Sequence, residues 1–271
     1  MEKENVIVPA EFADICPISD KDFHNEMSIL VEKPMFQQVV KFVMPDKKFS
    51  DVSRLLLSLN SKQEFQQKIM APLVGGILAK TSDGITFSNM ECLDKDTPYL
   101  HITNHRDIVL DSAILDMLLI DAGFTTTCEI AIGDNLLALP WVKDLVRLNK
   151  SFIVKRGLPM REMLMAGKTL SEYMHFAIQE KHENVWVAQR PGRAKDSNDR
   201  TSEGVLKMMT MGGTGTVPER LKELHIVPLT ISYEYDPCDY LKAVELQQKR
   251  DNPEWKKGPN DDIISMQTGI M

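Results

Sequence analysis

The sequence has few cysteines, and they lie far apart. Among its 271 residues are four, none in a Cys-x-x-Cys pair: Cys16, Cys92, Cys128 and Cys238. Disulfide frameworks are typical of short, cysteine-rich secreted chains, and zinc sites need closely spaced cysteine or histidine pairs. We therefore expect reduced thiols in the protein core, with neither disulfides nor a metal site.

The sequence also shows no signal-peptide pattern in its first residues and no long apolar runs. The N-terminal stretch "MEKENVIVPAEFADICP" is acidic and has no basic segment followed by an apolar one, so a secretory signal is not expected. The longest apolar runs, such as 136–139, are far shorter than the roughly 20 residues that span a bilayer. We expect a cytoplasmic protein, and peripheral contact with the inner face of the membrane stays an open alternative.

An excess of positive charge is missing as well. The formal net charge is −7, which argues against a nucleic-acid partner. Hydrophobic residues make up 43% of the chain and charged residues 26%, a composition typical of a globular protein rather than a disordered one. The length suits one large domain, or a domain with a smaller one attached.

The first part of the sequence is predicted to be helical. "NEMSILVEKPMFQQVVKFVM" and "DVSRLLLSLNSKQEFQQKIMAPLVGGIL" place apolar residues at helical spacing. We expect Pro34 and Pro72 to interrupt these helices.

From about residue 85 the pattern changes to strands alternating with helices, which predicts an α/β fold with a mainly parallel sheet. Helices are expected in "SAILDMLLIDAG", which ends at Gly123, in "PWVKDLVRLN" and in "REMLMAGKTLSEYMHFAIQEKH". The predicted buried strands are Tyr99–Thr103, Cys128–Ile132, Ser151–Lys155, Asn184–Gln189 and His225–Tyr233.

We divide the chain into a helical region at 1–80, an α/β domain at 81–240 and an extension at 241–271. The chain stops at "IISMQTGIM" without an obvious helix cap, so we expect it to be cut from a longer protein. The glycine-rich stretch Met211–Arg220 lacks the Gly-Lys-Ser/Thr ending of a phosphate-binding loop and is interpreted as an ordinary loop.

Polar residues follow three of the predicted strands. Asn104-His105-Arg106-Asp107 follows the first strand, and "RPGRAKD" (190–196) follows the fourth. Lys155 and Arg156 come at the end of the third. Functional groups of open α/β sheets gather beyond the carboxyl ends of the strands, so this arrangement suits proton abstraction beside an anionic substrate.

His105 and Asp111 are the candidate catalytic pair. A neutral imidazole can remove a proton from a hydroxyl near pH 7, and a carboxylate on its other nitrogen would fix its orientation. The alternative is structural: His105 would be a turn residue, and Asp111 the N-cap of the helix that follows.

The basic residues Lys155, Arg156, Arg193 and Lys195 are candidate phosphate ligands, since guanidinium and ammonium groups bind phosphate well. For either pair taken alone, an ordinary solvated loop is the favoured interpretation, and the phosphate-binding hypothesis rests on both pairs following strands on the same side as His105.

Four ordered stretches together resemble the glycerolipid acyltransferases, the superfamily of glycerol-3-phosphate and lysophosphatidic acid acyltransferases. "TNHRDIVLDSAI" resembles their His-x-x-x-x-Asp block, with five rather than four intervening residues. Asp111 is aligned because Ser-Ala-Ile follows it. "KSFIVKR", "VWVAQRPGRAKD" and "IVPLTISY" are similar to the second, third and fourth blocks. The third lacks the Pro-Glu-Gly form and is closer to the Gly-Gly-Arg form of the soluble plastid-type enzymes, which also carry a helical N-terminal domain.

The resemblance implies acyl transfer from an acyl-CoA or acyl-carrier-protein thioester to the hydroxyl of a glycerol-phosphate-type acceptor, without an acyl-enzyme. His105 would be the general base and Asp111 its orienting partner. Lys155, Arg156, Arg193 and Lys195 would hold the acceptor's phosphate. The thioester is a co-substrate, and no other cofactor is implied.

Two alternatives stay open. The acceptor could be a lysophospholipid or an amino-acid-based lipid. The protein could also be a catalytically inactive acyl- or lipid-binding protein.

Overall fold

The computed structural model describes residues 6–196, 198–258, 261 and 268. Its centre is a five-stranded parallel sheet in the order β3-β2-β4-β1-β5. The strands are β1 (Leu100–Thr103), β2 (Cys128–Gly133), β3 (Ser151–Val154), β4 (Asn184–Ala188) and β5 (Ile226–Leu229). The predicted α/β class with a mainly parallel sheet is confirmed.

The central strand β4 shows why both faces of the sheet are covered. Val185 and Val187 pack into one apolar core, and Trp186 between them packs into another. Successive side chains of a strand point to opposite faces, so a continuous apolar run needs a layer on each side.

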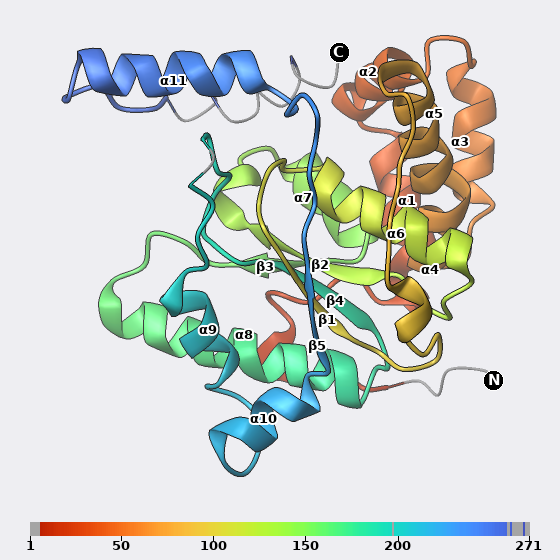
Figure 1. Cartoon of the computed structure of the whole chain (residues 1–271). Helices are drawn as coiled ribbons and strands as arrows, with labels where there is room; N and C mark the ends of the chain where they lie inside the picture. The colour runs from red at the N-terminus through yellow and green to blue at the C-terminus, as the bar shows by residue number, and fades with distance from the viewer. Residues whose placement is uncertain (1–5, 197, 259–260, 262–267, 269–271) are drawn as a thin grey trace.

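Helices supply these two layers (Figure 1). One face is covered by α8 (Met160–Gln179), α9 (Glu203–Met209) and the 3₁₀ turn η1 (Ala10–Phe12). The other is covered by α6 (Leu110–Ala122), which ends at Gly123 in the left-handed conformation (φ 79°). The remaining elements of this part are η3 (Met90–Cys92), η4 (Asp134–Leu136), α7 (Pro140–Leu148), α10 (Val217–Glu223) and α11 (Asp239–Asp251).

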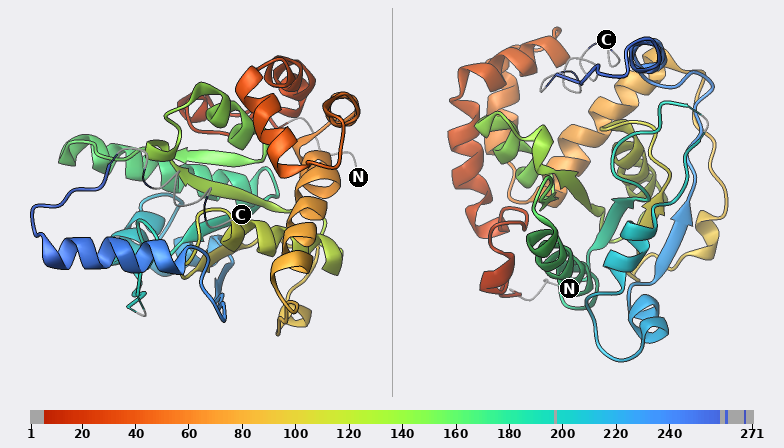
Figure 2. Two further views of the ribbon diagram at one scale, coloured as in Figure 1. Left: turned by 90° about the horizontal axis from the view of Figure 1, so that it is seen from above. Right: turned by 90° about the vertical axis from the view of Figure 1, so that its left-hand side faces the viewer.

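The N-terminal helices gather on one side of the sheet (Figure 2). They are α1 (Asp20–Val31), α2 (Pro34–Val43), α3 (Phe49–Leu57), α4 (Lys62–Phe65), the π-helical segment η2 (Gln66–Met70) and α5 (Ala71–Thr81). The elements from α1 to η2 share an apolar core with α7, and α5 packs against α6. The domain boundaries at 80 and 240 stay predictions.

The two prolines of this region behave differently. Pro34 separates α1 from α2, as predicted. Pro72 does not interrupt its helix: α4, η2 and α5 follow one another without a break from Lys62 to Thr81. The π-helical turn precedes Pro72, where the missing proline N–H removes one helical hydrogen bond.

The last strand is shorter than predicted. β5 ends at Leu229 rather than Tyr233, because its neighbour β1 ends at Thr103. Pro228 is tolerated because β5 is an edge strand. Beyond the strand, the Asn104 amide bonds both the N–H (2.8 Å) and the C=O (2.9 Å) of Ile231 and so continues the pairing with a side chain.

Two smaller expectations were partly wrong. All four cysteines are free, but Cys92 is exposed rather than part of the core. The stretch Met211–Arg220 is not a loop throughout, because α10 begins at Val217 behind a capping box of Thr216 and Glu219.

The predicted extension 241–271 contains most of α11, and nearly all of "IISMQTGIM" lies outside the described residues. Within the part of the chain that the structure describes, no helix is both long and apolar enough to cross a bilayer.

Candidate active site

His105 lies in the short connection between β1 and α6, at the carboxyl edge of the sheet. Its Nδ1 is 3.1 Å from Oδ2 of Asp111. The Asp111 side chain is fully buried, whereas that of His105 is 13% exposed. The five intervening residues thus allow the predicted pair to meet, with the carboxylate behind the imidazole.

The Asp111 carboxylate is held by several donors besides His105. Its Oδ2 accepts hydrogen bonds from the backbone N–H groups of Arg106 (2.7 Å) and Asp107 (2.9 Å). Its Oδ1 accepts one from the Tyr233 hydroxyl (3.1 Å). These bonds, and its place in the first turn of α6, compensate the cost of burying a charge.

The alternative role of Asp111 as the helix N-cap is wrong. Asp111 lies within α6, and Asp107 makes the capping contacts, since its Oδ1 accepts from Val109 N (2.9 Å) and Leu110 N (2.9 Å). The sequence contains two candidate carboxylates, and the fold assigns a different task to each.

Tyr233 and Trp186 complete the surroundings of the pair. Burial and the neighbouring Asp111 carboxylate raise the pKa of Tyr233, so its hydroxyl stays a neutral donor. The Trp186 ring lies edge-on to the His105 ring, with centroids 6.0 Å apart. Both contacts restrict how the imidazole and carboxylate can turn.

The backbone of His105 is fixed by the segment that follows β4. Its N–H donates to the Asp199 carboxylate (3.0 Å), and its carbonyl accepts from Ala194 N (2.8 Å). The next residue, Arg106, forms an ion pair with Asp236, which Lys242 also contacts at 2.8 Å. Segments from three parts of the chain therefore position this one loop.

Arg193 and Lys195 flank Ala194 and so lie beside the His105 loop. Arg193 is largely buried. The Lys195 ammonium lies 3.3 Å from Glu245 of α11, and burial lowers its pKa while Glu245 opposes that shift. The structure thus places these two predicted ligands next to the loop that carries His105.

Lys155 and Arg156 lie at the same edge of the sheet but farther along it. They follow β3, which is separated from β1 by β2 and β4. At the usual strand spacing this is about 14 Å between the strand axes. Both residues are exposed, and the nearest carboxylate to the Lys155 ammonium is Asp14 at 3.8 Å.

A small cavity with two further arginines opens beside this edge. Its volume is about 240 Å³, and it is lined by Arg190, Pro191, Asn198, Arg200 and Ser202. Arg190 donates to the carbonyl of Asn198 (3.0 Å). Arg190 and Arg200 are not among the predicted phosphate ligands, although Arg190 directly follows the predicted fourth strand.

Other supporting residues were missed because they come from distant parts of the sequence. Asp199 and Asp236 reach the His105 loop, and Tyr233 reaches Asp111, only through the fold. Only Tyr233 carried a signal, since it ends the fourth family-like block.

A partly exposed histidine can remove a proton from a substrate hydroxyl when a buried carboxylate lies behind it. The cations along the same edge of the sheet suit an anionic substrate. No curated protein matches this sequence. A family model described as "Acyltransferase" matches residues 84–232, more than half of the chain, and includes both His105 and Asp111. The chain belongs to the acyltransferase family.

Proposed function

We propose that this acyltransferase moves a fatty acyl group from an acyl-CoA or acyl-carrier-protein thioester to the hydroxyl of a glycerol-phosphate-type acceptor. The observation that carries the proposal is the 3.1 Å contact between His105 Nδ1 and Asp111 Oδ2 at the carboxyl edge of the sheet. The family match supports acyl transfer in general.

In the proposed reaction, His105 acts through Nε2, because Nδ1 faces Asp111. Nε2 takes the proton of the acceptor hydroxyl as the oxygen attacks the thioester carbonyl carbon. The C–S bond of the tetrahedral intermediate then breaks, and the thiolate leaves with the proton from His105. Asp111 stabilises the transient imidazolium, and no acyl-enzyme forms.

We propose Lys155, Arg156, Arg193 and Lys195 as ligands of the acceptor's phosphate, with Arg190 and Arg200 as additional candidates. The cavity beside the His105 loop supports this extension, since Arg190 and Arg200 both line it. Guanidinium groups bind phosphate oxygens in pairs, which would orient the acceptor hydroxyl toward His105.

For the acyl chain, we propose the first two turns of α8. This helix begins shortly after β3 ends, so its N-terminus lies at the same edge of the sheet as His105. Large apolar side chains are exposed there: Met160 (75%), Met163 (54%), Leu164 (56%) and Met165 (64%). Flexible methionines suit a long, variable acyl chain.

The test is thiol release from palmitoyl-CoA and from a palmitoyl-acyl carrier protein, each with and without glycerol-3-phosphate. We expect acceptor-dependent release that falls roughly 10²–10⁴-fold in His105→Ala, the usual contribution of a general base. The matched control is His24→Ala, which removes an exposed histidine on α1. Near-normal release by His105→Ala with an unchanged melting temperature would contradict the proposal.

The alternatives predict other results. Release with a lysophospholipid or an amino-acid-based lipid, but not with glycerol-3-phosphate, would replace the proposed acceptor. Thioester binding without release to any acceptor would identify an inactive binding protein.

A further inference from the structure

Helix α5 is apolar on two faces, and α6 covers only one of them. Val74 and Leu78 pack into the core shared with α6. A Cβ on Gly75 would lie 3.7 Å from Met117 of α6, so Gly75 belongs to the same face. Leu73 and Ile77 belong to the other face, and neither is fully buried.

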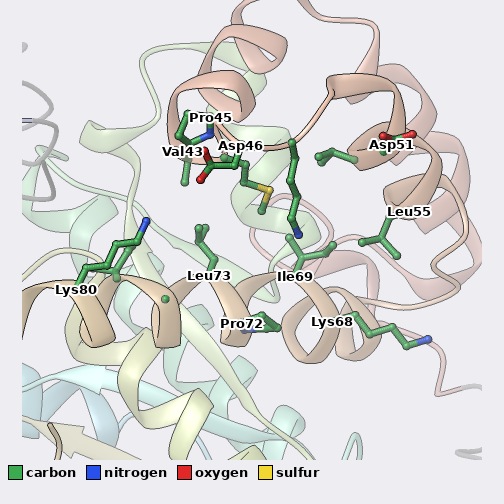
Figure 3. A pocket seen from close by; sticks show the side chains of 15 residues that line it. Val43, Pro45, Asp46, Asp51, Leu55, Lys68, Ile69, Pro72, Leu73 and Lys80 are labelled. Atoms are coloured by element: carbon green, nitrogen blue, oxygen red, sulfur yellow. The ribbon is translucent and has the colours of Figure 1, made fainter.

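The second face of α5 forms the floor of a pocket in the helical region (Figure 3). Across from it lie the end of α2, the connection that follows and α3, and Figure 3 shows Ile69 and Leu73 rising toward Val43 and Asp46. The volume is about 400 Å³, within the range of small-molecule sites. The apolar lining consists of Val43, Met44, Pro45, Val52, Leu55, Ile69, Pro72, Leu73, Gly76 and Ile77.

The rim of this pocket is charged. Lys68 pairs with Glu64 (3.1 Å) and Asp51 with Arg54 (3.6 Å). In the described part of the chain, the ammonium groups of Lys47 and Lys80 have no hydrogen bond or ion pair, and the lining also contains the carboxylate of Asp46. Available positive charge beside an apolar floor stands out in a chain of net charge −7.

We propose that this pocket binds an anionic amphiphile. The acyl chain lies on the face of α5 formed by Leu73, Gly76 and Ile77, and a carboxylate or phosphate head group contacts Lys47 and Lys80. The site is separate from His105, because the pocket lies on the side of α5 that faces away from α6. The inference does not depend on the proposed acyl transfer.

Gly76 offers a direct test. It lies within α5, and no atom is within 4 Å of the position that a Cβ would occupy. Gly76→Phe would place a ring in the pocket, whereas Gly76→Ala adds one methyl group and favours the helix. Binding of dodecyl phosphate to the full-length protein, measured by isothermal titration calorimetry, should weaken at least about tenfold in Gly76→Phe and stay unchanged in Gly76→Ala.

The charge requirement needs a second pair of variants. We expect Lys47→Glu/Lys80→Glu to weaken dodecyl phosphate binding at least about tenfold. Lys21→Glu/Lys222→Glu makes the same change in net charge at exposed lysines outside the pocket and should leave binding unchanged. Dodecyltrimethylammonium, with the same chain and the opposite charge, should not bind saturably.

A ligand that binds only the folded protein also raises its melting temperature. Dodecyl phosphate should therefore stabilise the wild type and Gly76→Ala, but not Gly76→Phe. The proposal would be overturned if the wild type did not bind dodecyl phosphate, or if Gly76→Phe bound it as tightly as the wild type does. Equally tight binding of inorganic phosphate would show an anion site without a chain site, and equally tight binding of the cationic amphiphile would refute the head-group assignment.

Discussion

The carboxyl and amino ends of the sheet each hold a cluster of buried polar side chains. At the amino end, the Lys150 ammonium lies just before β3 and is 2.7 Å from Glu183, 2.8 Å from Gln63 and 2.9 Å from Thr126. Its side chain is only 2% exposed. Gln63 comes from α4, so this cluster joins the N-terminal helices to the sheet.

At the carboxyl end, the Asp111 carboxylate is equally buried and hydrogen-bonded, but its partner His105 reaches solvent. The Lys150 ammonium is enclosed by its protein partners, whereas the His105 side chain is 13% exposed at the edge of the sheet. Burial and pairing of charge are therefore common to both ends, and solvent access distinguishes the candidate catalytic cluster from the enclosed one.

Besides His105→Ala, the largest effect on activity is expected for Asp111→Asn. The amide keeps an acceptor for Nδ1 of His105 but cannot stabilise the imidazolium by charge. We expect kcat/KM for acyl transfer to fall on the order of 10²–10⁴-fold, with KM for the thioester unchanged. Steady-state kinetics checks this, and a loss below about threefold would remove Asp111 from the catalytic role.

The largest effect on stability is expected at the other end of the sheet. Lys150→Met removes the ammonium that is paired with the buried Glu183 carboxylate at 2.7 Å, and breaking a buried ion pair costs about 3–5 kcal/mol of unfolding free energy. Urea denaturation measures this loss, and kcat of the folded fraction should stay unchanged. Lys155→Met, at the exposed end of the same strand, is the control and should change the unfolding free energy by no more than about 0.5 kcal/mol.

A pH-dependent contribution to stability is expected from Asp116, beside the Lys150 cluster. Burial raises its pKa from 3.8 to about 7, and its carboxylate accepts hydrogen bonds from Cys128 N (2.7 Å) and Gln66 (3.2 Å). Between these two values the folded protein binds a proton that the unfolded chain has lost. This group therefore lowers the unfolding free energy by about 1.4 kcal/mol for each pH unit from about 4 to 7, with no further change above.

Asp116→Asn should remove this contribution. Urea denaturation of both proteins at pH 5, 6, 7 and 8 would show the variant gaining stability relative to the wild type as the pH rises to 7. Parallel curves would mean that Asp116 titrates at an ordinary pKa.

The smallest effect on activity is expected for Tyr233→Phe. The change removes one hydrogen bond to Asp111 Oδ1, worth about 1 kcal/mol, so kcat should fall about three- to tenfold while KM stays constant. Tyr240→Phe, at an exposed position of α11, is the control. If both variants behaved alike, the Tyr233 contact would not position the catalytic pair.

The sequence predicted the strands, the α/β class and the contact between His105 and Asp111, because each depends on local pattern or short separation. It could not predict which carboxylate caps α6. Asp107 and Asp111 both suit a helix start, and the choice depends on where the loop brings the His105 ring.

The order of the strands in the sheet could not be predicted from the sequence either. All four predicted cations lie at the carboxyl edge of the sheet. Lys155 and Arg156 follow β3, three strands away from β1, whereas Arg193 and Lys195 follow β4, which is next to β1. The first two are therefore farther from His105. Asp199 and Lys242 contact the His105 loop, and Tyr233 contacts Asp111, from more than 90 residues away, a relation that no spacing rule encodes.

The most direct test of the central claim compares His105→Ala and Lys150→Met in one experiment, measuring both acceptor-dependent thiol release and the unfolding free energy. We expect His105→Ala to lose turnover and keep its stability, and Lys150→Met to lose stability and keep the turnover of its folded fraction. If His105→Ala kept its turnover, or if Lys150→Met lost turnover while fully folded, the assignment of chemistry to the carboxyl end and structure to the amino end would be contradicted.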